Sequence, residues 1–425
     1  MSHPNPGIVR AMRILQRVFQ DYCGNLAVRL WNDETLCFND APQSATLVFD
    51  RARPLRDMIL FRDPLRLAEA YFSGMVDVEG DIYEVLKLKD HLCSFSLSAR
   101  EKTVFAVAAL LLRDRAKAGD DDRVGYRRPW YSALLKRNGK EHNREAISYH
   151  YDVSNEFYGL WLDRQMVYSC AYFERPDQDL DQAQCNKLDL ICRKLRLRPG
   201  ERLLDIGCGW GALVLWAARH YGVHAHGVTL SRNQFEFGQR MIREQGLEHL
   251  VTLELKDYRD LAGEAGFDKI ASVGMFEHVG LKNLPLYFRT VRRLLKPDGL
   301  FLNHGITHEE DGWEKCLTTQ FINRYVFPDG ELDRVSSIQG LMEESCFEIL
   351  HVEALRPHYA LTLRHWVKRL EERREEALRH TSESVYRVWR LYMAACAQAF
   401  EEGSLGVYQI LAGPKGSHNW PEKME

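Results

Sequence analysis

The sequence predicts an α/β fold in which a mainly parallel, Rossmann-like sheet carries helices on both faces, preceded by a smaller α+β domain. Short apolar runs alternate with helical patterns from about residue 190 to 310. A glycine-rich turn joins one of these runs to the helix that follows it. Alternating strands and helices are typical of a parallel sheet that is covered on both sides.

The alternating region predicts five strands, at 202–206, 224–229, 251–255, 269–273 and 300–304. Helical patterns lie between them, including 233–245 and 284–295. Ligands of such sheets bind beyond the carboxyl ends of the strands. We therefore expect polar residues at these ends to meet in one crevice, namely Thr229, Asp257, Glu277 and His304.

The most specific motif is the segment 203–211, Leu-Leu-Asp-Ile-Gly-Cys-Gly-Trp-Gly. Its glycines allow a ligand to approach the backbone closely, although a plain glycine-rich turn is the alternative. Dinucleotide folds use Gly-x-Gly-x-x-Gly and an acidic residue on the second strand. Here 227–234 contains no carboxylate, so either Thr229 and Gln234 hold a ribose or the nucleotide assignment is wrong.

This glycine spacing, with Asp205 on the preceding strand, resembles motif I of the class I S-adenosylmethionine-dependent methyltransferases. The resemblance implies S-adenosylmethionine as cofactor. A ligand without phosphate needs close backbone approach, and it needs oxygens near its amino and sulfonium groups. A dehydrogenase is the weaker interpretation.

The first 120 residues predict an α+β module, with strands at 26–31, 35–38 and 45–49 and a helix at 64–72. An apolar run at 104–112 is too short to span a bilayer, and a buried core helix is favoured over membrane docking. The basic, aromatic stretch 126–131 is either a solvated linker or a contact with anionic lipid. We expect a boundary at 120–140 and domains at 1–125 and 140–420.

Composition limits the alternatives. The chain has 425 residues, a net charge of −3 and ten cysteines without a Cys-x-x-Cys pair. These features predict no nucleic-acid partner, no metal site and no disulfide framework. The start, 1–7, lacks signal-peptide character and no apolar stretch of membrane-spanning length occurs, so a cytoplasmic protein is expected.

Six segments together resemble the cyclopropane fatty acid synthases, in order and with compatible spacing: 149–158, 168–173, 203–211, 229–234, 272–280 and 357–360. The resemblance runs from about residue 140 to the C-terminus. The mycolic acid cyclopropane synthases carry similar segments. The N-terminal module resembles an extra domain of the phospholipid-acting branch, which the mycolate enzymes lack.

The resemblance implies transfer of a methylene group from S-adenosylmethionine to a cis double bond of an unsaturated phospholipid acyl chain. A cyclopropane forms, with a bound bicarbonate as proton acceptor. The enzyme would associate peripherally with the inner face of the membrane, and a homodimer is left open.

The family's bicarbonate site maps onto five residues of this chain. Glu277 matches the glutamate that orients the anion, and His304 and Tyr359 match its histidine and tyrosine. Ile306 and Cys170 match residues whose backbone faces the anion.

Cys396 aligns with a cysteine proposed as catalytic in the family, but its alanine-rich helical setting favours a buried structural thiol. The family's cofactor positions match Tyr168, Ser169, Asp205, Gly207, Cys208, Gly209, Gly211, Thr229, Gln234, Tyr258 and Arg259. Among these, Tyr258 would stack on the adenine.

Two departures keep the product open. The chain has Asn-His-Gly-Ile-Thr at 303–307, where many cyclopropane synthases have Leu-His-Thr-Ile, and 321–332 resembles a sister branch with methyl-branching enzymes. In those enzymes the carbocation rearranges before a proton is lost, which leaves an exomethylene group.

Two further hypotheses belong to other classes of protein. They are a small-molecule N- or O-methyltransferase, and a lipid-binding protein with a degenerate cofactor pocket. Added helices are expected at 313–325 and at 361–379, and the second is dense in charge, as in a lid, a subunit contact or a solvated face.

Overall fold

The computed structural model describes residues 6–61, 64–112, 154–261, 266–308 and 331–417. It divides into two compact units, Met1–Leu135 with Ser382–Ala395, and Lys136–Thr381 with Cys396–Glu425. The predicted linker, the stretch 126–131 and the predicted helix at 313–325 lie outside the described residues. The domain bounds 1–125 and 140–420 stay a prediction. They do not include the assignment of Ser382–Ala395, near the C-terminus, to the first unit.

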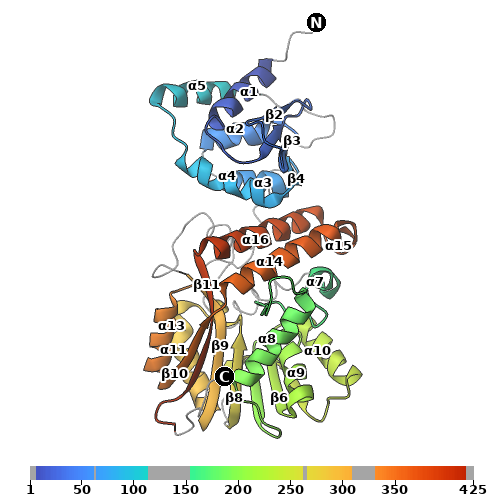
Figure 1. Cartoon of the computed structure of the whole chain (residues 1–425), viewed down its shortest axis with the longest axis vertical. Coiled ribbons are helices and arrows are strands. Elements are labelled where there is room, and N and C mark those ends of the chain that lie inside the picture. The colour runs from blue at the N-terminus through green and yellow to red at the C-terminus, as the bar shows by residue number, and fades with distance from the viewer. Residues whose placement is uncertain (1–5, 62–63, 113–153, 262–265, 309–330, 418–425) are drawn as a thin grey trace. The chain divides into compact units, whose positions relative to one another are not determined.

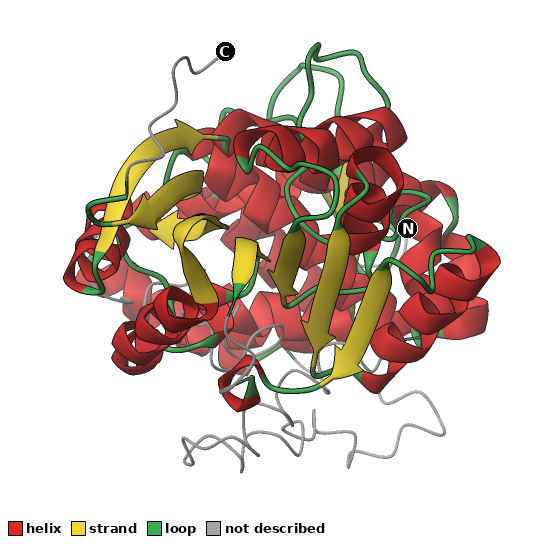
Figure 2. Cartoon of the chain, turned by 90° about the horizontal axis from the view of Figure 1, so that it is seen from below, coloured by secondary structure: helices red, strands yellow, loops and turns green. Residues whose placement is uncertain are grey.

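The larger unit contains a seven-stranded sheet of order β10-β11-β9-β8-β5-β6-β7 (Figures 1 and 2). The five strands from β9 to β7 are parallel, whereas β11 runs antiparallel to both of its neighbours. The strands are β5 (Arg202–Ile206), β6 (His224–Thr229), β7 (Val251–Leu255), β8 (Phe267–Val273), β9 (Leu295–His308), β10 (Phe347–Ala354) and β11 (Leu405–Pro414). All five predicted strands are confirmed, although β9 is much longer than 300–304.

Two hydrophobic clusters cover the two faces of this sheet. In β5, Leu203 belongs to one cluster and Leu204 to the other, because successive side chains point to opposite faces. The first cluster includes residues of α8 and α9, and the second includes residues of α11 and α13. The helices of this unit are α7 (Asn155–Trp161), α8 (Leu180–Lys194), α9 (Ala212–Tyr221), α10 (Arg232–Glu244), α11 (Leu284–Leu294), α13 (Val335–Glu344), α14 (Arg356–Glu372) and α15 (Arg374–His380). The predicted α/β fold is confirmed.

The smaller unit is built on a four-stranded sheet of order β2-β1-β3-β4. The predicted strands and the predicted helix at 64–72 are confirmed, whereas β4, α1, α2 and α4 were not predicted. The elements are α1 (Pro6–Val18), β1 (Leu26–Arg29), β2 (Thr35–Cys37), β3 (Ala45–Phe49), α2 (Ala52–Phe61), α3 (Pro64–Phe72), β4 (Val76–Gly80), α4 (Ile82–Ser94) and α5 (Ala99–Leu110).

The expectation of a buried core helix at 104–112 is wrong for much of α5. Ala109 is buried, but Val104, Val107 and Leu110 are 54%, 53% and 66% exposed. The part of this helix from Val104 onward is apolar on all sides, so periodicity could not show which face is covered. Among the described residues, no helix is both long and apolar enough to cross a bilayer.

Two buried arginines of α16 (Glu383–Glu402) belong to the smaller unit and bind the backbone of β4. Arg387 donates to the carbonyl oxygens of Tyr71 (2.8 Å) and Val76 (3.0 Å). Arg390 donates to the carbonyl oxygens of Val78 (3.3 Å) and Gly80 (3.2 Å) and to the Tyr71 hydroxyl (3.1 Å). These bonds give donors to backbone carbonyls of β4, and they add a second donor to the Tyr71 carbonyl, which already accepts from the Gly74 amide.

Replacing Arg390 by methionine keeps much of the buried volume but removes these donors. We expect the Arg390→Met chain to lose about 2–3 kcal/mol of the free energy of unfolding, because hydrogen bonds to a charged donor are lost and acceptors are left unpaired. Urea denaturation followed by circular dichroism measures the change. Arg379→Met, at an exposed position of α15, is the control and should change stability by less than about 0.5 kcal/mol. Equal effects of the two substitutions would contradict this role of Arg390.

Candidate active site

A pocket opens beyond the carboxyl ends of β5, β6 and β8, where the sequence placed the crevice. Gly207, Gly209 and Gly211 all have positive φ, which glycine adopts without strain. A Cβ at Gly207 would lie only 2.7 Å from Cγ of Met275. The amides of Gly207 and Cys208 both donate to the Val228 carbonyl at 3.0 Å, which ties the turn to β6.

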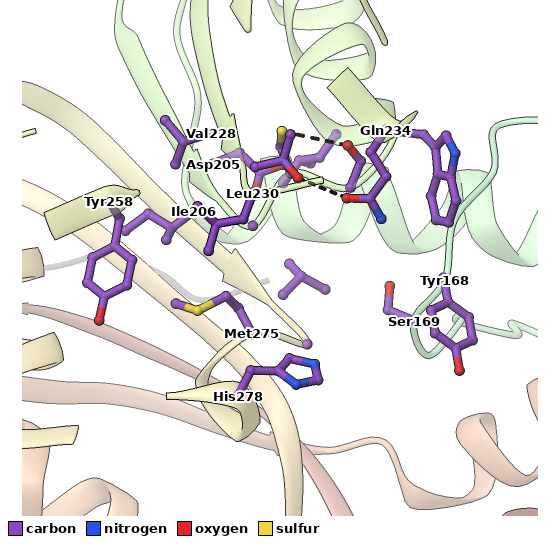
Figure 3. Close-up of a pocket in the computed structure, with 18 of the residues that line it drawn as sticks. Tyr168, Ser169, Asp205, Ile206, Val228, Leu230, Gln234, Tyr258, Met275 and His278 are labelled. Carbon is purple, nitrogen blue, oxygen red and sulfur yellow. Dashed lines mark hydrogen bonds between the residues drawn. The ribbon is translucent and has the colours of Figure 1, made fainter. Parts of the chain in front are cut away.

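The predicted cofactor residues line this pocket, with one exception. Gly211 is not in the wall; it is the residue that caps α9 at its N-terminus. Tyr258 stands on one side of the pocket and Tyr168 and Ser169 on the other, with Met275 and His278 between them (Figure 3). The residues in the wall are Tyr168, Ser169, Asp205, Gly207, Cys208, Gly209, Thr229, Gln234, Tyr258 and Arg259.

At the end of β6, an uncharged pair stands where dinucleotide folds carry an acidic residue. The Thr229 hydroxyl donates to Gln234 Oε1 at 2.8 Å, and both residues are buried (Figure 3). Ser231 caps α10 and its amide donates to the Thr229 hydroxyl at 3.2 Å. The pair carries no negative charge and thus offers only amide and hydroxyl groups to a ligand.

Tyr258 and Arg259 are held in place by Asp257 and Tyr287. Asp257 accepts from the amide and from Nε of Arg259, each at 2.9 Å. The Tyr258 ring meets the Tyr287 ring edge-on, with centroids 5.5 Å apart. Burial raises the pKa of Tyr258 to about 12, so the ring stays neutral and can present a face to an aromatic ligand.

A buried lysine, which the sequence did not single out, forms the base of the pocket. Lys187 of α8 is 2% exposed and its Nζ donates to the Ser169 hydroxyl at 3.0 Å. Burial lowers the pKa of Lys187, whereas the charges of Asp163 and Asp205 raise it. Lys187 is one of several charged residues of the amphipathic helix α8, so the sequence around it does not indicate that it lines a pocket.

Asp205 lies two residues before Gly207, the first glycine of the turn. Among the described residues its Oδ1 has no hydrogen-bond partner although it is buried. Burial raises the pKa of Asp205 to about 7, against the opposing charge of Lys187. A buried acceptor without a donor at the wall of the pocket fits the amino group that S-adenosylmethionine would present there.

Glu277 and Ile306 meet beyond the carboxyl end of β8, and His304 pairs with Val273 at that end. Glu277 Oε1 accepts from the Ile306 amide at 2.8 Å, and burial raises the pKa of Glu277 to about 7. His304 lies two residues before Ile306 on β9, so both side chains point to the same face. Burial lowers the pKa of His304 well below its usual value, which keeps the imidazole neutral. Within the described part of the chain, Glu277 Oε2 and His304 Nε2 are buried without partners.

Cys170 and Tyr359 meet at the Leu355 carbonyl. That oxygen accepts from the Tyr359 amide at 3.1 Å and lies 3.8 Å from Cys170 Sγ. Burial raises the pKa of the Cys170 thiol, which therefore stays protonated. The Tyr359 ring packs against Phe400 with centroids 4.7 Å apart.

Cys396, the sixth candidate, is buried in α16, as a structural thiol would be, and its role stays a prediction. None of the six predicted catalytic residues lies in the wall of the cofactor pocket, although Met275 and His278, beside Glu277, do.

The comparisons with known proteins agree with this geometry. The model of the family "Mycolic acid cyclopropane synthetase" matches residues 138–410. The chain belongs to this family. Residues 12–92 match a second family model, described as a domain of unknown function (DUF7884).

Two curated relatives show the range of names in the family. The chain is 41% identical to the "Probable fatty acid methyltransferase" of Pseudomonas putida, over 91% of each chain. It is also 41% identical to the cyclopropane-fatty-acyl-phospholipid synthase of Escherichia coli K12, over 62% of this chain and 66% of the relative. The first match includes the N-terminal unit.

Solved structures place the larger unit among cyclopropane synthases of Mycobacterium tuberculosis. MmaA2, and mycolic acid cyclopropane synthase CmaA1 complexed with SAH and CTAB, are each 34% identical, with a TM-score of 0.60. Each alignment covers 63% of this chain and 97% of the other. Coclaurine N-methyltransferase shares the fold alone, at 20% identity and a TM-score of 0.63. The family resemblance is confirmed, and the chain is an S-adenosylmethionine-dependent methyltransferase by family.

Asp205 gives a pH-dependent prediction for cofactor binding. Because its pKa is about 7, the carboxyl is mostly protonated one unit below that value and mostly ionised one unit above it. We expect affinity for S-adenosylhomocysteine to rise about tenfold over this interval, since only the carboxylate attracts the ligand's amino group.

Isothermal titration calorimetry from about pH 6 to pH 8 measures this rise. In Asp205→Asn the affinity can still change with pH, because the ligand's own amine titrates. Only the part of the change in the wild type that exceeds the change in Asp205→Asn therefore reports on Asp205. An equal pH dependence in the two proteins would show that Asp205 does not bind the cofactor as an anion.

Proposed function

We propose that the protein transfers the methyl group of S-adenosylmethionine to a cis double bond of an unsaturated phospholipid acyl chain and closes a cyclopropane, with bicarbonate as proton acceptor. One observation carries the proposal. Glu277 Oε2 and His304 Nε2 are buried without partners among the described residues, near the carboxyl end of β8, where Val273 and Met275 line the cofactor pocket. A catalyst of simple N- or O-methylation has no need for such a pair.

The cofactor residues bind and shield the reacting groups. When bound, S-adenosylmethionine supplies an electrophilic methyl group. An alkene is a weak nucleophile, so its position against that methyl must come from the shape of a dry site. Val273, Met275 and Leu286 give the pocket an apolar side that excludes water, which would otherwise trap a carbocation.

The buried pair suits an anionic proton acceptor. The electron pair of the double bond forms the new bond to the methyl carbon and leaves a carbocation on the acyl chain. A C–H electron pair of the added methyl group then closes the ring, and its proton passes to a base. A protonated Glu277 and a neutral His304 can each donate a hydrogen bond to an oxyanion, and both pKa shifts favour these states.

Labelled S-adenosylmethionine and vesicles of cis-unsaturated phospholipid provide the test. We expect label in the acyl chains of the wild type, and we expect His304→Ala and Glu277→Gln to lower the rate about 100-fold, as when a group that assists proton transfer is lost. Affinity for S-adenosylhomocysteine should stay the same in both variants. Lipid without label from a protein that binds cofactor, or variants with nearly intact transfer, would contradict the proposal and favour a small-molecule methyltransferase.

A methyl-branched product is the second candidate, because residue 305 is glycine where many cyclopropane synthases have threonine. A Cβ at Gly305 would lie 2.0 Å from Cε1 of Phe276. The Phe276 ring therefore occupies space beside His304 and Glu277 that is open only because residue 305 has no side chain. Mass spectrometry of the product chains before and after catalytic hydrogenation separates the candidates, because an exomethylene group takes up hydrogen under mild conditions.

We also propose that the N-terminal unit docks on the inner face of the membrane. In α5, Val104, Val107, Leu110 and the following Leu111 are exposed, and α2, which contacts α5, ends at the exposed Phe61. The Arg66 guanidinium lies 3.8 Å from the centre of the Phe61 ring, so a cation accompanies the apolar groups. Such a combination suits an anionic lipid surface.

The double variant Val107→Asp/Leu110→Asp tests this docking. We expect co-sedimentation with anionic vesicles to weaken about tenfold or more, because each apolar side chain contributes about 1.5–3 kcal/mol when buried. Thr103→Asp, at an exposed polar position of the same helix, is the control for charge. Unchanged vesicle binding combined with loss of a dimer in analytical ultracentrifugation would assign this face to a homodimer instead.

A further inference from the structure

A chain of hydrogen bonds leads from His304 through the sheet to a lysine near the surface. His304 Nδ1 lies 3.2 Å from Nε2 of Gln409, and Lys194 Nζ donates to Gln409 Oε1 at 2.6 Å. Lys194 also forms an ion pair with Glu353. The four residues come from β9, β11, α8 and β10, so elements far apart in the sequence build this chain. His304 and Gln409 are 1% and 0% exposed.

The lysine fixes which way the glutamine amide points. An ammonium group has donors but no acceptor, so the oxygen of Gln409 must face Lys194. The NH₂ group of Gln409 therefore faces His304 and donates to Nδ1. A neutral imidazole that accepts at Nδ1 carries its proton on Nε2.

The orientation matters because Nε2 is the atom of His304 that has no partner within the described residues. As an N–H group it can donate to an anion. A carboxylate at position 409 would instead accept from Nδ1 and would leave Nε2 with a lone pair. An amide in this place also adds no negative charge, so it does not favour a charged imidazole, in agreement with the lowered pKa of His304.

We propose that Gln409, held by Lys194, is a positioning residue that fixes His304 as the Nε2–H tautomer, so that His304 donates a hydrogen bond to the anion that accepts the proton. The inference rests on the proposed function for the identity of that anion. The tautomer itself can be measured without any reaction.

The first experiment is ¹⁵N NMR of the full chain labelled at histidine. The signals of His304 among the 16 histidines are identified by their loss in His304→Ala. We expect the wild type to show a protonated Nε2 and an unprotonated Nδ1. We expect Gln409→Glu to show a protonated Nδ1, and Lys194→Met, which frees the amide to turn, to show both tautomers.

Activity provides the second readout. We expect Gln409→Glu to lower kcat for acyl-chain labelling about 100-fold or more with little change in KM for S-adenosylmethionine, because a wrong tautomer disables a histidine that is otherwise in place. Lys194→Met should lower kcat less. Gln182→Glu, at an exposed position of α8, makes the same chemical change away from the site and should alter neither readout. Binding of S-adenosylhomocysteine shows that each variant is folded.

The outcomes separate this inference from the proposed function. A protonated Nδ1 in the wild type, or an unchanged tautomer in a folded Gln409→Glu protein, would overturn the inference. Labelling by Gln409→Glu at the wild-type rate would also overturn it. If the tautomers change as expected but no variant and no wild type labels lipid, the positioning stands and the proposed function fails.

Discussion

Ionisable side chains are buried at the carboxyl edge of the parallel strands, and the site depends on how their charges are balanced. Lys187 lies among Asp163, Asp205 and Ser169, and its positive charge offsets the cost of burying carboxylates there. No cation of the described residues offsets the burial of Glu277, which raises its pKa to about 7, and burial together with the charges of Lys187 and Lys194 lowers the pKa of His304 and keeps it neutral. We call the half of the site that contains Lys187 the charged half, and the half that contains Glu277 and His304 the neutral half.

These two halves have different chemical uses. The charged half adjoins the glycine turn and suits a cofactor with an amino group. The neutral half lies between β8 and β9, where the long β9 places His304 opposite Val273, the last residue of β8, and carries Ile306 past that end. Gln409 of β11 hydrogen-bonds to His304, and Lys194 of α8 binds Gln409 and pairs with Glu353 of β10. The antiparallel end of the sheet therefore serves the chemistry as well as the fold.

The sequence predicted the parts of the fold whose signals are local. The bounds of β5, β6 and β7 were correct because each is a short segment with apolar residues that is followed within two residues by glycine or a polar residue. The strands β10 and β11 were not predicted, since both lie outside the alternating region of residues 190–310. The exposure of α5 was also missed, because an apolar run does not show what covers it.

The residues of the site also fall into those with a local signal in the sequence and those without one. The glycine turn and the strand-end residues could be found from motifs and from the topology they imply. Lys187 and Gln409 could not, because each is a single polar residue whose role comes from partners that only the folded chain supplies. Gly211 was predicted from the motif as a cofactor residue, but it caps α9 at its N-terminus and does not line the pocket.

The central claim is that the neutral half of the site removes a proton from the methyl group after its transfer. S-adenosylmethionine with a fully deuterated methyl group tests this claim most directly, with mass spectrometry of the acyl chains. Two deuterium atoms in each modified chain are predicted, because one deuteron leaves whether a ring or an exomethylene group forms. Three deuterium atoms in the product would contradict the account, since the methyl group would then have been transferred intact.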